Sequence, residues 1–166
     1  GSISLTDGGD DAIDFSGTFT HEGSLTIQDF TDNGVQPSGG TLLVGSSATI
    51  TVDNVDRGLT GLLLVNNGTI KIETTNSDAI NTGGDCSNSG EITLSGVGSD
   101  GIDLESGSTF TNTGIIRILD ANSQALEGGL FDQAASGALF IAGEITSVVQ
   151  LAGGSELHPG SSPGCV

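Results

Sequence analysis

Apolar residues recur along this chain at intervals of 22 to 24 residues, and each recurrence has the same local pattern. The segments "FTHEGSLTI" (19–27), "LVNNGTIKI" (64–72), "CSNSGEITL" (86–94) and "FTNTGIIRI" (110–118) carry apolar residues two and four positions after a glycine. Aligned on Gly114, the equivalent positions are Gly23, Ser46, Gly68, Gly90, Gly137 and Ser161. Apolar and polar residues that alternate after a turn glycine are typical of a half-buried strand. The period therefore predicts one such strand in every repeat.

These predicted strands supply two columns of inward-facing side chains. The first column stands two residues after each anchor and contains Leu25, Ala48, Ile70, Ile92, Ile116, Leu139 and Pro163. The second stands four residues after it and contains Ile27, Ile50, Ile72, Leu94, Ile118, Ile141 and Cys165. Equivalent residues of successive turns lie about 4.8 Å apart in a stack of strands, so the columns predict a continuous aliphatic core.

Two further apolar columns indicate that each repeat contains three short strands. One lies four residues before the anchor and contains Phe19, Leu42, Leu64, Cys86, Phe110 and Leu157. Gln133 breaks this column, and Phe131 takes its place if the segment before Gly137 contains a two-residue bulge. The other column contains Ile13, Ile80, Ile102 and Leu126. Three strands per repeat predict an all-β fold, a right-handed parallel β-helix solenoid of about seven turns with 22–24 residues per turn.

The length and the first residues define the expected domain organisation. A chain of 166 residues fits one domain with a sizeable core. It begins with "GS" and contains no methionine. We therefore expect residues 1–2 to be a cloning remnant and residues 3–166 to be a single β-helix domain taken from a longer protein.

Three asparagines stand two residues before successive anchors, at Asn66, Asn88 and Asn112. Residues at equivalent positions stack in a solenoid, so we expect these side chains to form a ladder of amides that satisfy one another. Asparagine is also a common turn former, and the sequence alone leaves that simpler interpretation open.

The "NxGxIxI" turns and the final segment "ELHPGSSPGCV" (156–166) resemble the passenger repeats of bacterial autotransporters and related secreted surface proteins. The resemblance of the repeats covers about residues 10–150. It implies an elongated extracellular protein on the bacterial cell surface that serves as a stalk or an adhesin.

Charge narrows the range of partners. The formal net charge is −18, and Arg57, Lys71 and Arg117 are the only lysine or arginine residues. This charge disfavours nucleic acid as a partner, because binding of a phosphate backbone depends on clustered basic groups. No apolar run approaches the roughly 18 residues that a membrane-spanning helix needs, so we expect no direct membrane insertion.

Carboxylates gather at one corner of the predicted coil, in "GGDDAIDF" (8–15), "NSDAINTGGD" (76–85) and "GSDGIDLES" (98–106). One predicted column there contains Asp78, Asp100 and Gln124, and a second contains Asn81, Asp103 and Glu127. Stacked carboxylates repel, and calcium takes six or more oxygen ligands from such groups. Asp78, Asp100 and Asp103 are therefore candidate calcium ligands, and plain solvation of an exposed turn is the alternative.

Residues that often carry catalysis are scattered. His21 and His158 fall in the first and last turns, so they do not share a site. Cys86 and Cys165 belong to different columns and distant turns, which disfavours a disulfide between them. The sequence contains no tryptophan or tyrosine on which a sugar could stack. We expect no enzymatic activity, and a carbohydrate-active β-helix is the competing class.

Other surface positions suggest association. Ile115, Leu119 and Phe140 are apolar residues on the outward side of the fifth and sixth turns and form a candidate interface. The outward threonine column is interrupted at Lys71 and Arg117, which disfavours ice binding. Both ends of a solenoid present unpaired strand edges, so end-to-end self-association is expected.

Taken together, these patterns favour a non-enzymatic structural or adhesive segment of a bacterial extracellular surface protein. The alternative is a carbohydrate-binding or carbohydrate-active β-helix. The expected partner is a host or surface glycan or protein, and no cofactor is expected apart from the candidate calcium.

Overall fold

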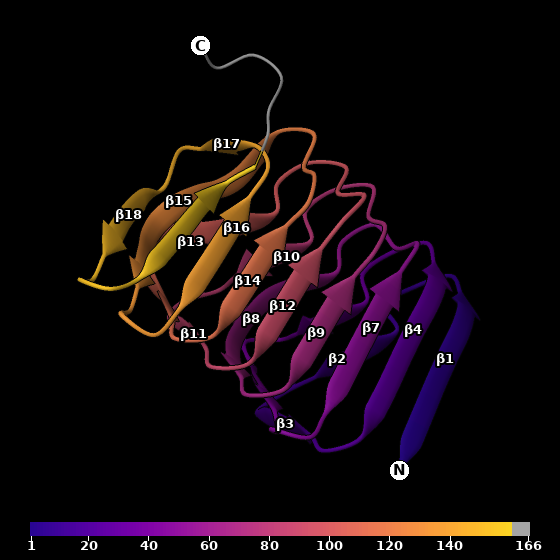
Figure 1. Ribbon diagram of the computed structural model, residues 1–166. Coiled ribbons are helices and arrows are strands. Elements are labelled where there is room, and N and C mark those ends of the chain that lie inside the picture. Colours follow the sequence, from indigo (N-terminus) through magenta and orange to yellow (C-terminus); the bar gives the residue numbers. More distant parts are fainter. Residues whose placement is uncertain (161–166) are drawn as a thin grey trace.

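A computed structural model describes residues 1–160, and every regular element in that range is a β-strand (Figure 1). The strands pair in parallel and stack in about seven coils, so the predicted β-solenoid is confirmed. The part of the chain that the structure describes contains no helix long and apolar enough to span a membrane.

One side of the solenoid is an eight-stranded parallel sheet, which we call sheet A. Figure 1 shows its strands side by side, from indigo at the N-terminal end to yellow at the C-terminal end. In spatial order they are β1 (Ser2–Gly8), β4 (Ser24–Phe30), β7 (Thr49–Asp53), β9 (Thr69–Ile72), β12 (Glu91–Leu94), β14 (Ile115–Ile118), β16 (Ala138–Ile141) and β19 (Glu156–Pro159). Sheet A therefore receives one strand from each coil.

The rest of each coil belongs to an eleven-stranded sheet, sheet B. Its strands are β2 (Ile13–Phe15), β3 (Thr18–His21), β5 (Val35–Pro37), β6 (Thr41–Val44), β8 (Leu59–Asn66), β10 (Ile80–Thr82), β11 (Cys86–Asn88), β13 (Ile102–Asn112), β15 (Gln124–Gln133), β17 (Glu144–Ile145) and β18 (Val148–Leu151). Long strands such as β15 bend where a glycine allows it. Gly128 has φ +72°, and a Cβ there would lie 2.1 Å from the Leu104 carbonyl oxygen of the coil below.

The register of sheet A confirms most of the predicted columns. Ile70 pairs with Ile92, Ile92 with Ile116, and Ile116 with Leu139. These side chains are fully buried. The inner file of aliphatic residues therefore runs without interruption through the middle of the molecule.

Two predicted anchors are wrong. Leu25 pairs with Ile50, and Ile50 pairs with Ile70, so the anchor of that coil is Ala48 instead of Ser46. Ser46 and Ser47 form an extra turn that is closed by a hydrogen bond from the Ala48 N–H to the Gly45 carbonyl oxygen at 2.9 Å. Because apolar residues alternate with period two in "SATITV", a shift of two residues keeps the same pattern and is invisible in the sequence.

The last coil contains the second error. Leu157 pairs with Leu139 in sheet A, so Leu157 does not belong to the column of Phe110. Ser155 takes the anchor position, and a hydrogen bond from its N–H to the Ala152 carbonyl oxygen closes another extra turn. The predicted positions Ser161, Pro163 and Cys165 lie outside the described residues.

The column before the anchors otherwise follows the prediction. Phe131 pairs with Phe110 and replaces Gln133, as the predicted bulge requires, and Val149 then pairs with Phe131. The two phenylalanine rings stack with centroids 5.4 Å apart. The third predicted column is also continuous, and the structure adds Val35, Leu59 and Ile145 to it.

The three asparagines lie over one another in β8, β11 and β13. Asn66 Nδ2 donates to Asn88 Oδ1 at 2.7 Å, and Asn88 Nδ2 donates to Asn112 Oδ1 at 2.8 Å. Asn112 Nδ2 then donates to Gln133 Oε1 at 2.8 Å, so Gln133 extends the ladder that the sequence pattern ends at Asn112. These four side chains are at most 1% exposed, so each buried amide depends on its neighbours for hydrogen bonding.

Candidate functional site

The outward face of sheet A carries a row of three stacked side chains near its C-terminal end. Arg117, Phe140 and His158 occupy equivalent positions in β14, β16 and β19. The Arg117 guanidinium lies 5.0 Å from the centre of the Phe140 ring, and the Phe140 and His158 rings stack at 4.4 Å with 7° between their planes. We call these three residues the outer row. They are brought together because residues at equivalent positions of parallel strands stack directly.

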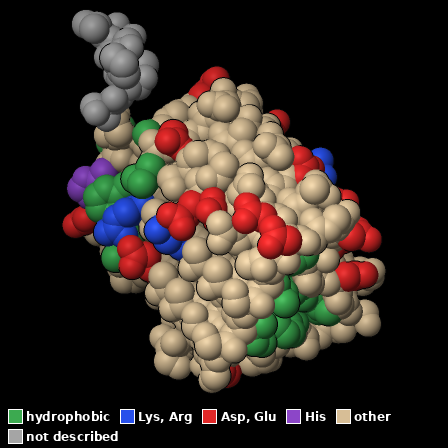
Figure 2. All heavy atoms as spheres, turned by 90° about the vertical axis from the view of Figure 1, so that its right-hand side faces the viewer, with side chains coloured by type: hydrophobic (Ala, Val, Ile, Leu, Met, Phe, Trp, Pro, Cys, Tyr) green, Lys and Arg blue, Asp and Glu red, His purple; other side chains and the backbone are tan. Residues whose placement is uncertain are grey.

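Acidic side chains flank the outer row. Arg117 pairs with Glu91 of β12, and His158 Nε2 lies 3.0 Å from Glu156 Oε2. Figure 2 shows histidine, hydrophobic and basic side chains adjoining at one edge of the molecule, with acidic side chains close by. The row therefore combines an aromatic surface with hydrogen-bond donors and acceptors on a face that otherwise carries mostly small polar residues.

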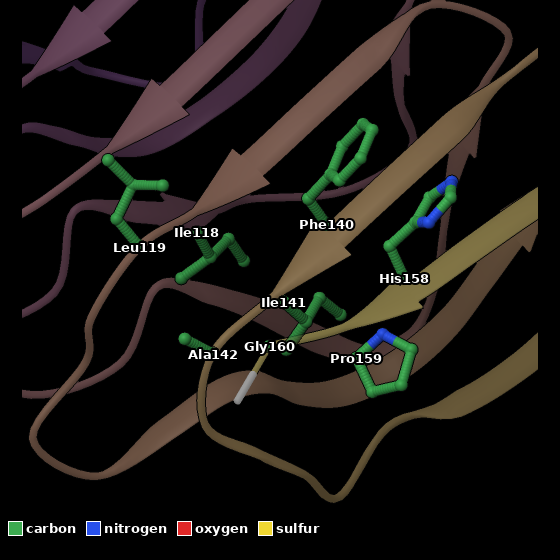
Figure 3. Close-up of a pocket in the computed structure, with 8 residues that line it drawn as sticks. All are labelled: Ile118, Leu119, Phe140, Ile141, Ala142, His158, Pro159 and Gly160. Atoms are coloured by element: carbon green, nitrogen blue, oxygen red, sulfur yellow. The ribbon is translucent and has the colours of Figure 1, made fainter. Parts of the chain in front are cut away.

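A pocket of about 290 Å³ opens beside the outer row, where β14, β16 and β19 end (Figure 3). Phe140, His158, Leu119 and Pro159 contribute to its walls. Figure 3 shows Leu119 and the two rings on neighbouring strands around the same hollow. An aromatic ring at the edge of a partly apolar pocket is typical of sites that bind small organic groups or sugars.

The structure places the three predicted interface residues on this outward face of sheet A. Leu119, 54% exposed, and Phe140 line the same pocket. Ile115 lies in the neighbouring outward row, opposite Ala138 of β16. The pocket therefore combines two of the three predicted residues with His158 and Pro159, which the pattern of exposed apolar positions did not single out.

The candidate calcium ligands lie at a different corner, where the chain enters β10 and β13. Asp78 Oδ1 accepts a hydrogen bond from the Asp100 N–H at 3.3 Å, and Asp100 Oδ1 accepts one from the Gln124 N–H at 2.8 Å. Asp103 stacks between Asn81 and Glu127, and its Oδ2 accepts a hydrogen bond from Asn81 Nδ2 at 2.6 Å. These carboxylates therefore act as staples between successive coils.

Proton affinity at this corner is uneven. Burial raises the pKa of Asp103, the Asp78 and Asp100 charges raise it further, and the hydrogen bond from Asn81 opposes them. A hydrogen bond to Asp100 and the Asp100 charge raise the pKa of Glu127. Burial acts to raise the pKa of Asp100 as well, but the hydrogen bonds that its carboxylate accepts outweigh burial and lower it. Of Asp100 and Glu127, Glu127 is therefore the residue that holds a proton more readily.

A second group of acidic side chains lies on the same side of the solenoid, but in the first two coils, and forms a separate acidic corner. Oxygens of Asp10, Asp11 and Asp32 lie within 4.8 Å of one another. The sequence pattern identified the segment that contains Asp10 and Asp11, but the partner Asp32 follows only from the register that stacks β5 on β2.

The side chains of Cys86 and His21, which could act as a nucleophile or a base, are buried in the core of the solenoid. The Cys86 sulfur is buried and accepts a hydrogen bond from the Leu64 N–H at 3.1 Å. Burial raises the pKa of this thiol to about 11, so it is protonated and a poor nucleophile. His21 is also buried and packs against Phe19 in the first coil, far along the stack from His158.

The outer row and its pocket are therefore the strongest candidate for binding a partner, and the acidic corners are the strongest candidates for binding a cation. Comparison with protein-family models, with curated protein sequences and with solved structures finds no match to the chain.

Proposed function

We propose that this chain is a non-enzymatic, rigid segment of a bacterial extracellular surface protein, which spaces or displays a binding region. The observation that carries the proposal is the unbroken parallel register of sheet A from β1 to β19. Each coil rests on the next through inward columns that are fully buried over most of their length. Such a stack resists bending because any hinge would have to separate paired strands and expose their core residues.

The chemistry of the polar groups supports a structural role. Asp78 and Asp100 use their carboxylates to accept backbone N–H groups from the following coil. The side-chain amides of the asparagine ladder likewise form hydrogen bonds between successive coils. Side chains that are committed to such bonds are held in place and serve the stack, which favours a scaffold over a catalytic centre.

The location is part of the same proposal. The "NxGxIxI" turns resemble repeats of secreted bacterial surface proteins, and a net charge of −18 suits a solvated, extended surface. A stalk or an adhesin needs a stiff body and one exposed contact region, and the outer row supplies the latter.

Two measurements test the scaffold proposal: cleavage of polysaccharides by the chain, and amide hydrogen exchange along the stack of strands. The chain is incubated with a panel of acidic and neutral polysaccharides, and newly formed reducing ends and unsaturated products are measured. We expect no product above the buffer control, and we expect amide hydrogen exchange to be slow continuously from β4 to β16. Release of products that Asp100→Asn abolishes would contradict the proposal, and so would a fast-exchanging gap in the middle of the stack.

A carbohydrate-binding role is the second candidate, and the outer row favours it specifically. The edge of the Phe140 ring lines a pocket, and Arg117 and His158, which stack on the two faces of the ring, supply polar groups next to it. The test is a glycan array probed with the labelled chain and with Phe140→Ala. Leu63→Ala is the matched control because Leu63 is an exposed apolar residue of β8, away from the outer row. We expect Phe140→Ala to lose the signal that Leu63→Ala retains. Equal binding by both variants would rule out the outer row as the glycan site.

A further inference from the structure

The acidic corner of the first two coils is built from residues that stack through the parallel pairing of β2 and β5. Asp10 and Asp11 lie shortly before β2, and Asp32 lies shortly before β5. Ile13 pairs with Val35, and the Ala12 N–H donates to the Asn33 carbonyl oxygen at 2.9 Å. This register brings one oxygen of each carboxylate to within 4.8 Å of the other two.

Asn33 stands inside this group and is only 3% exposed. Its Nδ2 lies 2.8 Å from Asp11 Oδ1 and 2.9 Å from Asp32 Oδ1, and it also contacts Gln36 Oε1. An amide nitrogen carries two hydrogens, so three acceptors around it cannot all be satisfied. In addition, Asn33 Oδ1 is buried without a hydrogen-bond partner. The Asp11 N–H donates to Asp10 Oδ1 and the Asn33 N–H donates to Asp11 Oδ1, each at 3.1 Å, and the group still holds more oxygen atoms than these donors can serve.

Basic side chains do not neutralise this group among the described residues. Arg57 occupies the next coil, directly after Asn33 in the stack, but its guanidinium pairs with Asp56 at 3.9 Å and with Asp78 at 3.8 Å. Three carboxylates at this separation repel one another, and a bound cation would relieve the repulsion.

We propose that Asp10, Asp11 and Asp32 bind a calcium ion, with the side-chain oxygen of Asn33 as a neutral ligand. Calcium accepts six to eight oxygen ligands in flexible geometry, from carboxylates, amide oxygens and water. Rotation of the Asn33 amide about its Cβ–Cγ bond exchanges Oδ1 with Nδ2 and turns the unpartnered oxygen toward Asp11 and Asp32. Gln36 Oε1 then becomes a further neutral oxygen at the same place. Magnesium fits less well because it requires a compact octahedron and gives up water reluctantly.

The other acidic corner provides the contrast that makes this assignment specific. There, Asp78, Asp100 and Asp103 accept hydrogen bonds from four different donors, two of them backbone N–H groups. In the first two coils, Asp11 Oδ1 accepts hydrogen bonds from the Asn33 N–H at 3.1 Å and from the Asn33 amide, and Asp32 accepts one from the Asn33 amide. Among the described residues, Asp10, Asp11 and Asp32 are the group of three carboxylates whose oxygens converge within 4.8 Å, and this convergence favours a cation there over the corner of Asp78, Asp100 and Asp103.

Calorimetric titration tests the proposal. The chain is stripped with EDTA, dialysed and titrated with calcium chloride, and its thermal unfolding is followed in EDTA and in calcium. We expect one saturable site, a Tm that rises by several degrees in calcium, and weaker binding of magnesium. Asp32→Asn should bind calcium at least tenfold more weakly. In EDTA, the Tm of this variant should equal or exceed the Tm of the wild type. Asp103→Asn is the matched control from the other corner and should bind like the wild type.

Two results would overturn the proposal. One is the absence of any saturable binding or Tm change at millimolar calcium. The other is loss of binding in Asp103→Asn with full binding in Asp32→Asn, which would move the ion to the second corner. If Asp32→Asn does not fold, Asp10→Asn replaces it, because Asp10 is exposed and its side chain has few structural contacts to lose.

Discussion

Single residues contribute to this molecule chiefly through what stacks above and below them. Asn88 illustrates the point because its amide both donates to Asn112 and accepts from Asn66. The same side chain at an ordinary exposed turn would be worth little. Within a buried ladder, its removal leaves Asn112 Oδ1 without its donor and takes from Asn66 Nδ2 its shortest hydrogen bond, at 2.7 Å, leaving only two longer ones at 3.3 Å.

Asn88→Ala should therefore lower the free energy of unfolding by about 2–3 kcal/mol, because the buried Asn112 Oδ1 loses its donor and Asn66 Nδ2 loses its shortest hydrogen bond. Asn67→Ala is the control, since Asn67 is exposed in the same turn and should change stability by less than about 0.5 kcal/mol. Urea denaturation of both variants measures the difference. Similar midpoints for the two would show that the ladder does not carry stability.

The acidic corner gives a prediction about pH. Burial and the neighbouring charges raise the folded pKa of Asp103 above its ordinary value, so its ionised form destabilises the fold, and this penalty grows as pH rises through the folded pKa. Asp103→Asn removes the penalty and keeps an acceptor for Asn81 Nδ2. The variant should unfold at a higher temperature than the wild type at pH 7, and the advantage should shrink at pH 4. Thermal melts at the two pH values check this, and an advantage that grows on acidification would refute it.

At the scale of elements, the turn that leads into sheet A controls the register. Coils with the Asn-x-Gly turn stack tightly at the glycine: a Cβ on Gly114 would lie 2.1 Å from the Gly90 carbonyl oxygen. Other coils use a longer turn, as at Gly45–Ala48 and Ala134–Gly137, each closed by a backbone hydrogen bond of about the ordinary length. Both turns deliver the chain to the same strand position.

Gly114→Ala should consequently destabilise the fold by at least about 2 kcal/mol, because the added methyl group forces neighbouring coils apart. Gly153→Ala is the matched control, since a Cβ at Gly153 meets nothing within 4 Å. Chemical denaturation compares the two variants. Equal stability would mean that the coils are less closely stacked at the anchor than the structure indicates.

The two turn types also explain which parts of the strand register could be predicted from the sequence. Where the Asn-x-Gly turn recurs, as at Gly68, Gly90 and Gly114, the predicted register is correct. At Ser46 and Ser161 the anchor has no glycine, and period-two alternation allows a shift of an even number of residues at no change in pattern. The pocket beside Phe140 could not be predicted in full, because its walls depend on the register of β19 in the last coil.

Within residues 1–160, which the structure describes, the molecule is a stack that ends in unpaired edge strands. β1 and β19 are the edge strands of sheet A, and the last coil exposes apolar side chains at Val148 and Leu151, which are 68% and 49% exposed. Unpaired strand edges with apolar residues beside them favour stacking of one copy on another.

Light scattering should accordingly show that the apparent mass of the chain rises with concentration. The double variant Val148→Lys and Leu151→Lys should reduce this association, because charges at the end coil would have to be buried. Leu63→Lys, which changes an exposed residue on the side of the solenoid, should leave it unchanged. A strictly constant monomer mass at high concentration would contradict end-to-end stacking.

The most direct test of the stacked rod is a distance between two of its strands that are far apart in sequence. Spin labels on Ser4→Cys and Arg117→Cys, in a background with Cys86→Ser and Cys165→Ser, report on equivalent outward positions of β1 and β14. Five strand spacings separate these strands in sheet A. Double electron–electron resonance should therefore give a single distance peak centred near about 24 Å, with a width set by the label arms. A broad distribution, or a centre beyond about 40 Å, would contradict the continuous stack.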